Sequence, residues 1–255
     1  MTLTAIILTR NNQASIKQLL VSLSWCDEII VIDDESSDKT RIIAKKLGAK
    51  VLRHPLRHNF AAQRNFGLQQ AKGDWAIFID SDEIVTPQLV REIGAEVKSS
   101  AYLAYSVRRL DIFLGKTLRF GETGNINLIR LARRTAGRWH RPVHEIWHIK
   151  VPIGQLRFPL YHHPHPSLTS FLEKINHYTT IESKFRPIPS KTRLLLELMF
   201  YPPAKFLYNY IFKLGFLDGW PGLSLTMMMS LHSLLVRLKL YEKSLAQPAH
   251  HSNRR

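Results

Sequence analysis

A short acidic segment directly after an apolar strand constrains this 255-residue chain more than any other feature. Residues 75–79 read Trp-Ala-Ile-Phe-Ile, and they are followed at once by Asp80, Ser81, Asp82 and Glu83. A buried strand of this kind brings its carboxyl end to the edge of an open α/β sheet, where such folds bind their ligands. Carboxylate oxygens placed there suit Mg²⁺ or Mn²⁺ held against a diphosphate. Alone the pattern is weak, because acidic residues are also common in solvated turns.

The first hundred residues alternate strand and helix patterns. Apolar runs predict strands over residues 3–8, 29–32, 51–52 and 75–79, and helical spacing predicts helices over 15–23, 40–47 and 61–71. Nearly continuous apolar strands between helices predict a parallel sheet that is covered on both faces. Right-handed crossovers bring the carboxyl ends of such strands to one edge. We therefore expect Asp33 and Asp34, after the second strand, to face the same crevice as Asp80 and Asp82.

Four ordered blocks make this pattern specific. They are residues 9–12 (Thr-Arg-Asn-Asn), 31–38 (Val-Ile-Asp-Asp-Glu-Ser-Ser-Asp), 63–67 (Gln-Arg-Asn-Phe-Gly) and 73–83. Together they resemble the signature blocks of the family-two, GT-A-fold glycosyltransferases. Within that family the chain is most similar to the bacterial enzymes that add a sugar to the inner core of lipopolysaccharide. The resemblance extends to 143–145 (Val-His-Glu) and to 215–222 (Gly-Phe-Leu-Asp-Gly-Trp-Pro-Gly).

The resemblance implies an α/β fold with a GT-A-like, Rossmann-type mixed and mainly parallel sheet, flanking helices, and a carboxyl-terminal apolar, amphipathic helical region. We expect the catalytic domain over residues 1–165, with a nucleotide-sugar half at 1–100 and an acceptor half at 101–165. A helical, membrane-associating region is expected over 166–245, and a flexible tail over 246–255.

The resemblance also implies a donor site at the sheet edge. The nucleotide-sugar contacts that it implies are Thr9, Asn11, Asp33, Asp34, Arg64 and Asp80, and the implied ligands of Mg²⁺ or Mn²⁺ are Asp80 and Asp82. For residues 33–38 the alternative is a helix amino-terminal cap, which we assign to Asp38 rather than to Asp33. For residues 63–65 the alternative is an exposed helix face.

An inverting sugar transfer needs a base for the acceptor hydroxyl's proton and a cation for the departing diphosphate. The resemblance implies an acidic base from the second half of the catalytic domain, and we assign it to Glu145. His144 is the competing candidate, because an imidazole titrates near neutrality. A partly exposed strand without a catalytic role is the alternative for both residues.

Two groups of histidines invite a metal interpretation. His140, His144 and His148 are spaced four apart, but Pro142 and the many aromatic and β-branched neighbours favour extended structure. In one strand, successive members would lie ~13 Å apart, which is too far for a single ion. The tract 162–165 (His-His-Pro-His) is either a zinc-binding loop or a loop that lines the acceptor site.

Positive charge is concentrated in the second part of the chain. The net charge is +16, yet residues 1–100 carry 13 Lys and Arg against 12 Asp and Glu, 101–150 carry 10 against 3, and 151–255 carry 13 against 5. This distribution suits an anionic lipid leaflet or a phosphorylated acceptor. Nucleic acid would attract the same charge and is the main competing partner. The arginines that would contact phosphates are Arg130, Arg133, Arg134, Arg138 and Arg141.

The carboxyl-terminal quarter favours a membrane over nucleic acid. Residues 194–201, 206–212 and 223–240 are apolar with Lys and Arg among them, as in amphipathic helices that lie in a membrane interface. Residues 215–236 carry one charge, but Pro221 interrupts them, so we expect an interfacial or re-entrant segment rather than a span. The alternative is that these helices pack on the sheet or on another subunit.

Together these features predict a metal-dependent, inverting glycosyltransferase, with hexosyl transfer expected. The donor is a nucleotide-diphosphate sugar, and the acceptor is the lipopolysaccharide core or a related anionic envelope glycolipid. We expect a peripheral protein at the cytoplasmic face of the inner membrane, since the amino terminus lacks a signal-peptide pattern and the single Cys26 excludes an internal disulfide. A polyprenyl-phosphate sugar transferase, a nucleotidyltransferase and a non-enzymatic nucleic-acid-binding protein are the alternatives.

Overall fold

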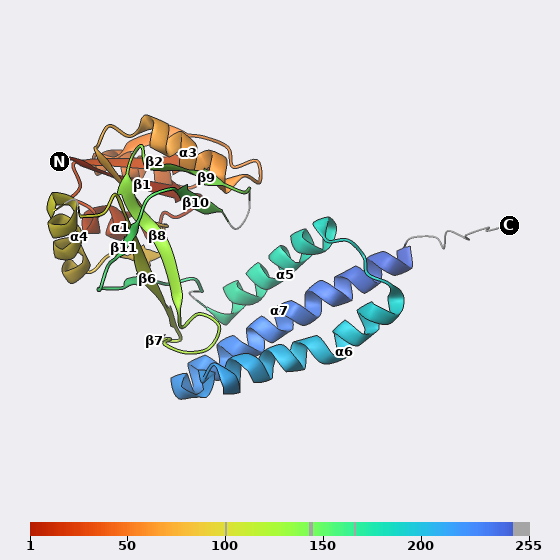
Figure 1. Cartoon of the computed structure of the whole chain (residues 1–255). Helices are drawn as coiled ribbons and strands as arrows, with labels where there is room; N and C mark the ends of the chain where they lie inside the picture. The colour runs from red at the N-terminus through yellow and green to blue at the C-terminus, as the bar shows by residue number, and fades with distance from the viewer. Residues whose placement is uncertain (100, 143–144, 166, 247–255) are drawn as a thin grey trace. The chain divides into compact units, whose positions relative to one another are not determined.

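The chain forms two compact units, which are drawn in Figure 1. The computed structural model describes residues 1–99, 101–142, 145–165 and 167–246. Unit 1 comprises Met1–Leu110 and Ile126–His162, and unit 2 comprises Asp111–Asn125 and His163–Arg255. This division differs from the boundary expected near residue 165, because the segment 111–125 groups with the helices rather than with the acceptor half of the catalytic domain.

Unit 1 begins with the alternating strands and helices that the sequence predicted. The elements are β1 (Leu3–Thr9), α1 (Ile16–Ser22), β2 (Glu28–Asp33), α2 (Thr40–Lys46), β3 (Lys50–Arg53), α3 (Phe60–Gln70) and β4 (Trp75–Phe78). β1 pairs with β2 and with β4, and β2 pairs with β3, in each case in parallel. The parallel sheet expected for this half is confirmed.

The rest of unit 1 extends the same sheet, mostly in the antiparallel sense. Its elements are β5 (Glu83–Ile84), α4 (Pro87–Ser99), β6 (Ala104–Phe113, whose last residues belong to unit 2), β8 (Ile126–Arg133), β9 (Gly137–His140), β10 (Ile146–Ile149), β11 (Ile153–Gln155) and β12 (Leu160–His162). The strand order is β3-β2-β1-β4-β8-β6-β12-β5, with β8 antiparallel to β4 and β6, and β12 antiparallel to β5. β9 and β10 form a separate antiparallel hairpin. The mixed α/β sheet is therefore confirmed.

Alternating side chains of the central strands divide unit 1 into two apolar layers. Ala5 and Ile7 of β1 face the layer that contains α1, α2 and α4, whereas Ile6 faces the layer that contains α3 and the β9–β10 hairpin. All three side chains are fully buried. Burying one such isoleucine stabilises the fold by roughly 1.5–3 kcal/mol, so this alternation fixes the sheet between its two covers.

One glycine lets α3 approach the sheet closely. A Cβ atom at Gly67 would lie 2.6 Å from Cγ2 of Ile6 on β1. Arg64 lies one turn earlier on the same buried side of α3. The absence of a side chain at residue 67 therefore helps to set how close the Arg64 side chain comes to the sheet.

Unit 2 consists mainly of helices. Its elements are β7 (Lys116–Thr117), α5 (Leu168–Phe185), α6 (Lys191–Leu207), the π-helical turn η1 (Tyr208–Phe212), the 3-10 turn η2 (Gly215–Asp218) and α7 (Gly219–Ala246). α7 packs against both α5 and α6, and Figure 1 shows the three helices side by side. Leu194 of α6 is fully buried against Val236 and Leu240 of α7.

Pro221 does not interrupt the apolar segment, contrary to the sequence-based expectation. It occupies the first turn of α7, where a backbone N–H has no partner within the helix, so proline is tolerated there. The helical stretch Gly215–Ala246 is consequently long and apolar enough to cross a membrane by length and composition. Core helices of soluble proteins can meet the same criterion, and α7 packs on α5 and α6, but only 33% of its most apolar window is buried.

We predict that Gly67→Ala destabilises the protein by about 1–3 kcal/mol, because the added methyl group must push α3 away from Ile6. Gly94→Ala in α4 is the matched control. A Cβ there meets no atom within 4 Å, so this change should stabilise the helix by about 0.5–1 kcal/mol. Urea unfolding followed by circular dichroism measures both; equal effects of the two substitutions would contradict the close-approach argument.

Candidate active site

Three strand ends meet at one edge of the sheet. The register places Thr9 of β1 beside Asp33 of β2, and Ile6 of β1 beside Phe78 of β4. The backbone N–H of Ile79 also donates to the carbonyl of Ile6, at 3.2 Å. Because these strands are parallel, the loops that carry the two acidic clusters leave the sheet in the same direction.

The loops after β1 and β2 are joined by side-chain to backbone hydrogen bonds. The N–H of Asn11 donates to Oγ of Ser36 at 2.9 Å, and the N–H of Ser37 donates to Oδ1 of Asn11 at 2.9 Å. Asn11 and Glu35 both adopt φ of 52°, which is uncommon for residues with a side chain. Strained backbone of this kind persists where the surrounding contacts hold it, and it is concentrated at functional sites.

The two neighbouring aspartates after β2 have different partners. Both oxygens of Asp34 are used locally, since they accept from the N–H of Leu56 at 2.7 Å and from Arg10 at 3.1 Å. Asp33 is fully buried, and its Oδ2 accepts from the N–H of Ser36 at 3.0 Å. Its Oδ1 is buried without a hydrogen-bond partner among the described residues. A hydrogen-bond donor on a ligand would satisfy that oxygen, because buried acceptors are normally paired.

Asp38 acts at the start of α2, as expected. Its Oδ1 accepts from the N–H of Thr40 at 2.9 Å, which satisfies one of the free amides of the first turn. Burial raises the pKa of Asp38, but hydrogen bonds with Thr40 and Gln13 outweigh this effect and lower the pKa.

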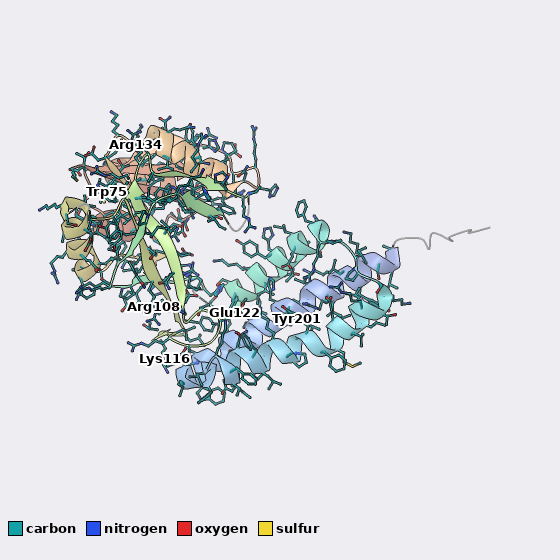
Figure 2. The ribbon with its side chains drawn as sticks, in the orientation of Figure 1. Trp75, Arg108, Lys116, Glu122, Arg134 and Tyr201 are labelled. Atoms are coloured by element: carbon teal, nitrogen blue, oxygen red, sulfur yellow. The ribbon has the colours of Figure 1, made fainter. Side chains whose placement is uncertain are left out.

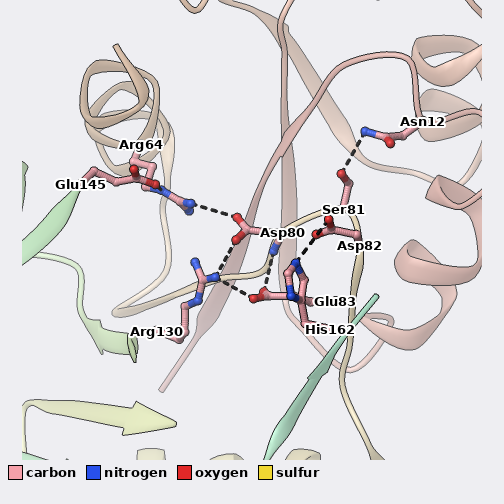
Figure 3. A network of polar contacts seen from close by, with 9 residues as sticks. All are labelled: Asn12, Arg64, Asp80, Ser81, Asp82, Glu83, Arg130, Glu145 and His162. Carbon is pink, nitrogen blue, oxygen red and sulfur yellow. Dashed lines mark hydrogen bonds and ion pairs between the residues drawn. The ribbon is translucent and has the colours of Figure 1, made fainter. Parts of the chain in front are cut away.

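Asp80 lies between two arginines at the centre of the site, as Figure 3 shows. Its Oδ1 accepts from Arg64 at 2.9 Å and its Oδ2 from Arg130 at 2.5 Å. Arg130 also contacts Oε1 of Glu83 at 2.6 Å, and the N–H of Asp80 donates to Oε2 of Glu83 at 2.8 Å. The guanidinium groups thereby connect α3, β8, β5 and the loop after β4.

Burial and charge act in opposite directions on these groups. Burial raises the pKa of Asp80, but Arg130 and Arg64 outweigh it and hold the pKa far below its usual range. For Glu83 burial prevails, so its pKa is raised although Arg130 opposes the shift. Burial lowers the pKa of Arg130, and Asp80 and Glu83 more than compensate, so its pKa is raised. Arg130 and Asp80 are therefore ionised at neutral pH.

Arg64 links Asp80 to the proposed base. Its Nε donates to Oε1 of Glu145 at 3.0 Å, while the guanidinium lies 4.7 Å from the ring centre of Trp139 and 5.5 Å from that of Phe78. The Arg64 side chain is only 5% exposed. Aromatic faces attract a cation and limit its movement, so Arg64 is held where it can orient the Glu145 carboxylate.

The neighbours of Arg64 are also engaged, so the exposed-helix alternative for residues 63–65 is wrong. Gln63 donates to the carbonyl of His54, and Asn65 exchanges two hydrogen bonds with the backbone of Trp139, at 2.8 and 2.9 Å. Asn65 therefore attaches the β9–β10 hairpin to α3.

Asp82 has a histidine beside it. Nε2 of His162 lies 3.4 Å from Oδ2 of Asp82, and Asp82 is the more exposed of the two side chains, at 38% against 12%. The antiparallel register of β12 with β5 brings His162 opposite Glu83. On the other side of the loop, Asn12 donates to Oγ of Ser81 at 2.9 Å.

The structure brings together residues that the sequence did not assign to the site. They are Asn12, Glu83, Arg130 and His162. Asn12 and Glu83 stand inside the quoted blocks, and His162 stands inside the histidine tract, so signals existed for these three. Arg130 was expected to contact phosphates, which is wrong, because its side chain is 5% exposed and pairs with Asp80 and Glu83.

Two further arginines of that basic group make contacts inside unit 1. The guanidinium of Arg133 lies 5.0 Å from the ring centre of Trp75, and Nε of Arg134 donates to the carbonyl of Gly73 at 3.1 Å. These contacts leave Arg138 and Arg141, both exposed, as the members of the group without such an internal role in the described residues.

The histidines around residue 144 do not lie in a single strand. His140 ends β9 and His148 lies in the antiparallel β10, so their rings are 5.6 Å apart rather than far separated. The expectation of one continuous extended segment is wrong, because the chain reverses between residues 140 and 146. His144 itself lies outside the described residues, and its catalytic assignment stays a prediction.

The donor atoms set limits on a metal site. Across the described ranges, no three His, Cys, Asp or Glu side chains are grouped so that they could hold a metal ion alone. Asp82 and His162 offer two ligands, and both oxygens of Asp80 contact guanidinium groups. An ion here would need further ligands from a bound phosphate and water, which is the usual arrangement for Mg²⁺.

Comparison with family models identifies one family, and several relatives are named glycosyltransferases. The model described as "Glycosyl transferase family 2" matches residues 4–151. A relative from Rickettsia bellii, named an uncharacterized glycosyltransferase, is 28% identical over 261 residues, which cover 95% of this chain and 87% of that protein. The lipopolysaccharide core biosynthesis glycosyltransferase LpsC of Rhizobium meliloti is 26% identical over 251 residues, covering 94% and 92%.

A solved structure shows partial similarity. Glucosyl-3-phosphoglycerate synthase from Mycobacterium tuberculosis, in complex with Mn²⁺, UDP and glucosyl-3-phosphoglycerate, is 27% identical with a TM-score of 0.38, covering 44% of each chain.

We predict that Arg130→Met lowers the free energy of unfolding at pH 7 by about 3–5 kcal/mol, because Glu83 is left buried without its cation. Glu83 already has a raised pKa in the folded state, so its charge opposes folding at neutral pH and ceases to do so as acid protonates it. The deficit should therefore shrink as the pH is lowered from 7. Arg91→Met, at an exposed position of α4, is the control. A deficit that stays constant with pH would contradict the assignment.

Proposed function

We propose, because the chain belongs to glycosyl transferase family 2, that it transfers a sugar from a nucleotide-diphosphate donor to an acceptor hydroxyl with inversion. One observation carries the proposal: three features lie at strand ends and loops of unit 1. They are a buried, unsatisfied oxygen of Asp33, the Asp82–His162 pair and the Arg64-bound Glu145. The first suits a nucleoside, the second a cation with a diphosphate, and the third an acceptor hydroxyl.

The residues fit a divalent cation. Among the described residues, Asp80, Glu83 and Glu145 each contact a guanidinium group, whereas Asp82 contacts His162 instead, so Asp82 is the carboxylate that suits a cation. We assign the ion to Asp82 and His162, and a mixed carboxylate and imidazole set suits Mn²⁺ better than Mg²⁺. When bound, such an ion supplies positive charge to the departing diphosphate. Asp80, which the sequence also assigned to the metal, is held by Arg64 and Arg130 and contributes to placing the loop.

The chain's own residues perform the other steps. Oδ1 of Asp33 accepts a hydrogen bond from the nucleobase of the donor. Thr9, Asn11 and Asp34 keep the neighbouring loops in position. Glu145 removes the proton of the acceptor hydroxyl as that oxygen attacks the anomeric carbon, and the nucleoside diphosphate leaves from the opposite side of the sugar. Arg64 keeps the Glu145 carboxylate oriented for this transfer.

We assign the acceptor to the lipopolysaccharide core or a related envelope glycolipid. The name of the Rhizobium meliloti relative supports this class, and the similarity covers nearly the whole of both chains. The excess of basic residues after residue 100 suits an anionic glycolipid and the cytoplasmic membrane surface. A polyprenyl-phosphate acceptor would use the same donor site, and parallel assays with the two lipids distinguish the products.

The experiment that tests the reaction class is a screen of nucleotide sugars, with and without Mn²⁺, for protection against thermal unfolding. A true donor stabilises the folded state by mass action, by about 2.7 kcal/mol at a concentration of 100 Kd. We expect one donor to raise the melting temperature only with the metal present. Protection by nucleoside triphosphates with release of pyrophosphate would instead indicate a nucleotidyltransferase.

Asp82→Ala and His162→Ala should each remove the metal-dependent part of that protection and nearly abolish sugar transfer. Asp82→Ala should not lower the melting temperature of the free protein by much, because the Asp82 side chain is 38% exposed. Glu173→Ala, which removes an exposed carboxylate of α5, is the control. Unchanged Mn²⁺ binding by both variants would show that the cation is not bound by Asp82 and His162.

Glu145→Gln should lower kcat by about 10²- to 10⁴-fold while leaving donor protection intact, because glutamine still accepts from Arg64 but cannot take a proton. Measurement of kcat and of donor KM separates loss of the base from loss of binding. Undiminished turnover would transfer the role to another group, with His144 the first candidate.

A further inference from the structure

The connection between α6 and α7 exposes an unusual amount of apolar surface. We call residues 207–220 the apolar turn. Its large exposed apolar side chains, between 43% and 79% exposed, are Leu207, Tyr208, Ile211, Phe212, Leu214, Phe216, Leu217 and Trp220. Soluble monomers rarely expose a contiguous patch of this kind unless it binds a partner or a membrane.

Two polar side chains of the same segment face inward. Asp218 is 2% exposed and accepts from the backbone N–H groups of Arg119 and Phe120, at 3.0 and 2.9 Å. Asn209 is 3% exposed and donates to Glu122 at 3.2 Å, and Glu122 also contacts Lys205 at 3.1 Å. Apart from the exposed Lys213, the turn therefore has polar side chains inside and apolar side chains outside, the reverse of an ordinary surface loop.

The backbone of the apolar turn is held in this conformation. Leu214 adopts φ of 57°, a left-handed conformation that is rare for a residue with a bulky side chain. Gly215 and Gly222 allow the close contact beneath it, since a Cβ on Gly222 would overlap the carbonyl oxygen of Gly215. An outlier that the surrounding contacts maintain is consistent with a functional surface.

An apolar stripe on α6 leads into the turn. The exposed residues at helical spacing are Leu195, Leu196, Met199, Phe200, Pro203 and Leu207. The opposite side of α6 packs on α7 through Leu194, so the stripe is the outer side of the helix. An apolar stripe of this length suits a helix that lies in the plane of an interface.

The exposed charges beside the turn are all positive. Lys213 is in the turn itself, and Lys116 and Arg119 are in the segment tied to it, where Nζ of Lys116 lies 3.5 Å from the carbonyl of Leu217. Figure 2 labels Lys116 at this end of the helical unit. The acids of the same region, Glu122 and Asp218, are engaged internally. Such a rim is complementary to anionic lipid headgroups.

We propose that the apolar turn and the α6 stripe insert into the interfacial layer of an anionic phospholipid bilayer, while α7 stays packed between α5 and α6. The inference deepens the membrane-side part of the proposed function, since a lipid-linked acceptor would be met at that surface. Its test needs neither a sugar donor nor an acceptor, so its failure and the failure of the proposed reaction are distinguishable.

Trp220 provides a direct probe, because it is 79% exposed, whereas Trp75, Trp139 and Trp147 are buried and Trp25 is half-buried in unit 1. Vesicles of phosphatidylethanolamine and phosphatidylglycerol should shift its emission to the blue, and brominated acyl chains should quench it. Trp220→Phe should lose the bromine-sensitive component and keep vesicle binding. A spectrum of the wild-type protein that vesicles leave unchanged would overturn the proposal.

The second measurement is cosedimentation with the same vesicles. The double variant Phe212→Ser with Trp220→Ser should bind about tenfold or more weakly, because two large anchors are removed. The matched control, Val21→Ser with Ile42→Ser, removes exposed apolar side chains from unit 1 and should bind as the wild type does. Lys116→Gln with Lys213→Gln should weaken binding to anionic but not to neutral vesicles.

Sedimentation velocity without lipid tests whether a second copy of the chain, rather than a bilayer, covers the apolar turn. A wild-type dimer that the Phe212→Ser, Trp220→Ser variant dissociates, together with unquenched Trp220 in vesicles, would assign the turn to a second copy of the chain and overturn the bilayer proposal. A monomer whose Trp220 is quenched supports it.

Discussion

The carboxylate of Asp80 is the interaction on which the arrangement of the site depends. It receives one guanidinium from α3 and another from β8, and each guanidinium continues to a second carboxylate, Glu145 or Glu83. Isolated charges at this depth would be costly to bury, whereas the alternation of sign makes the group stable as a set. The loop after β4 is thereby placed relative to the hairpin that carries Glu145, although the two are far apart in sequence.

The sequence was sufficient for the parts of the fold that are set by local patterns. The apolar runs and helical spacing of the first eighty residues predicted β1 to β4 and α1 to α3, because buried parallel strands and their covering helices follow short periodicities. The convergence of Asp33 and Asp80 at one edge followed from the handedness of the crossovers. The family was also evident, because four blocks occurred in order.

What the sequence could not provide depends on tertiary contacts. In the sequence, Arg130 cannot be distinguished from the other arginines of its basic group, because only the fold of β8 places it beside Asp80. The position of His162 beside Asp82 likewise depends on the register of β12 with β5. The reversal between β9 and β10 was missed because its strands are four residues each, too short for a periodic signal. Pro221 was misread because the same residue that breaks a helix interior is favourable in a first turn.

The close contact between α3 and β1 has an evolutionary consequence. Gly67 touches no proposed ligand, yet it lies three residues from Arg64 on the same buried side of the helix, and Arg64 orients Glu145. A side chain at residue 67 would push the helix away from β1 and shift Arg64, and with it the proposed base Glu145. In a genetic selection for activity, such a change would be scored as a loss of activity. Its cause would nevertheless be the distance between α3 and β1 at a single contact.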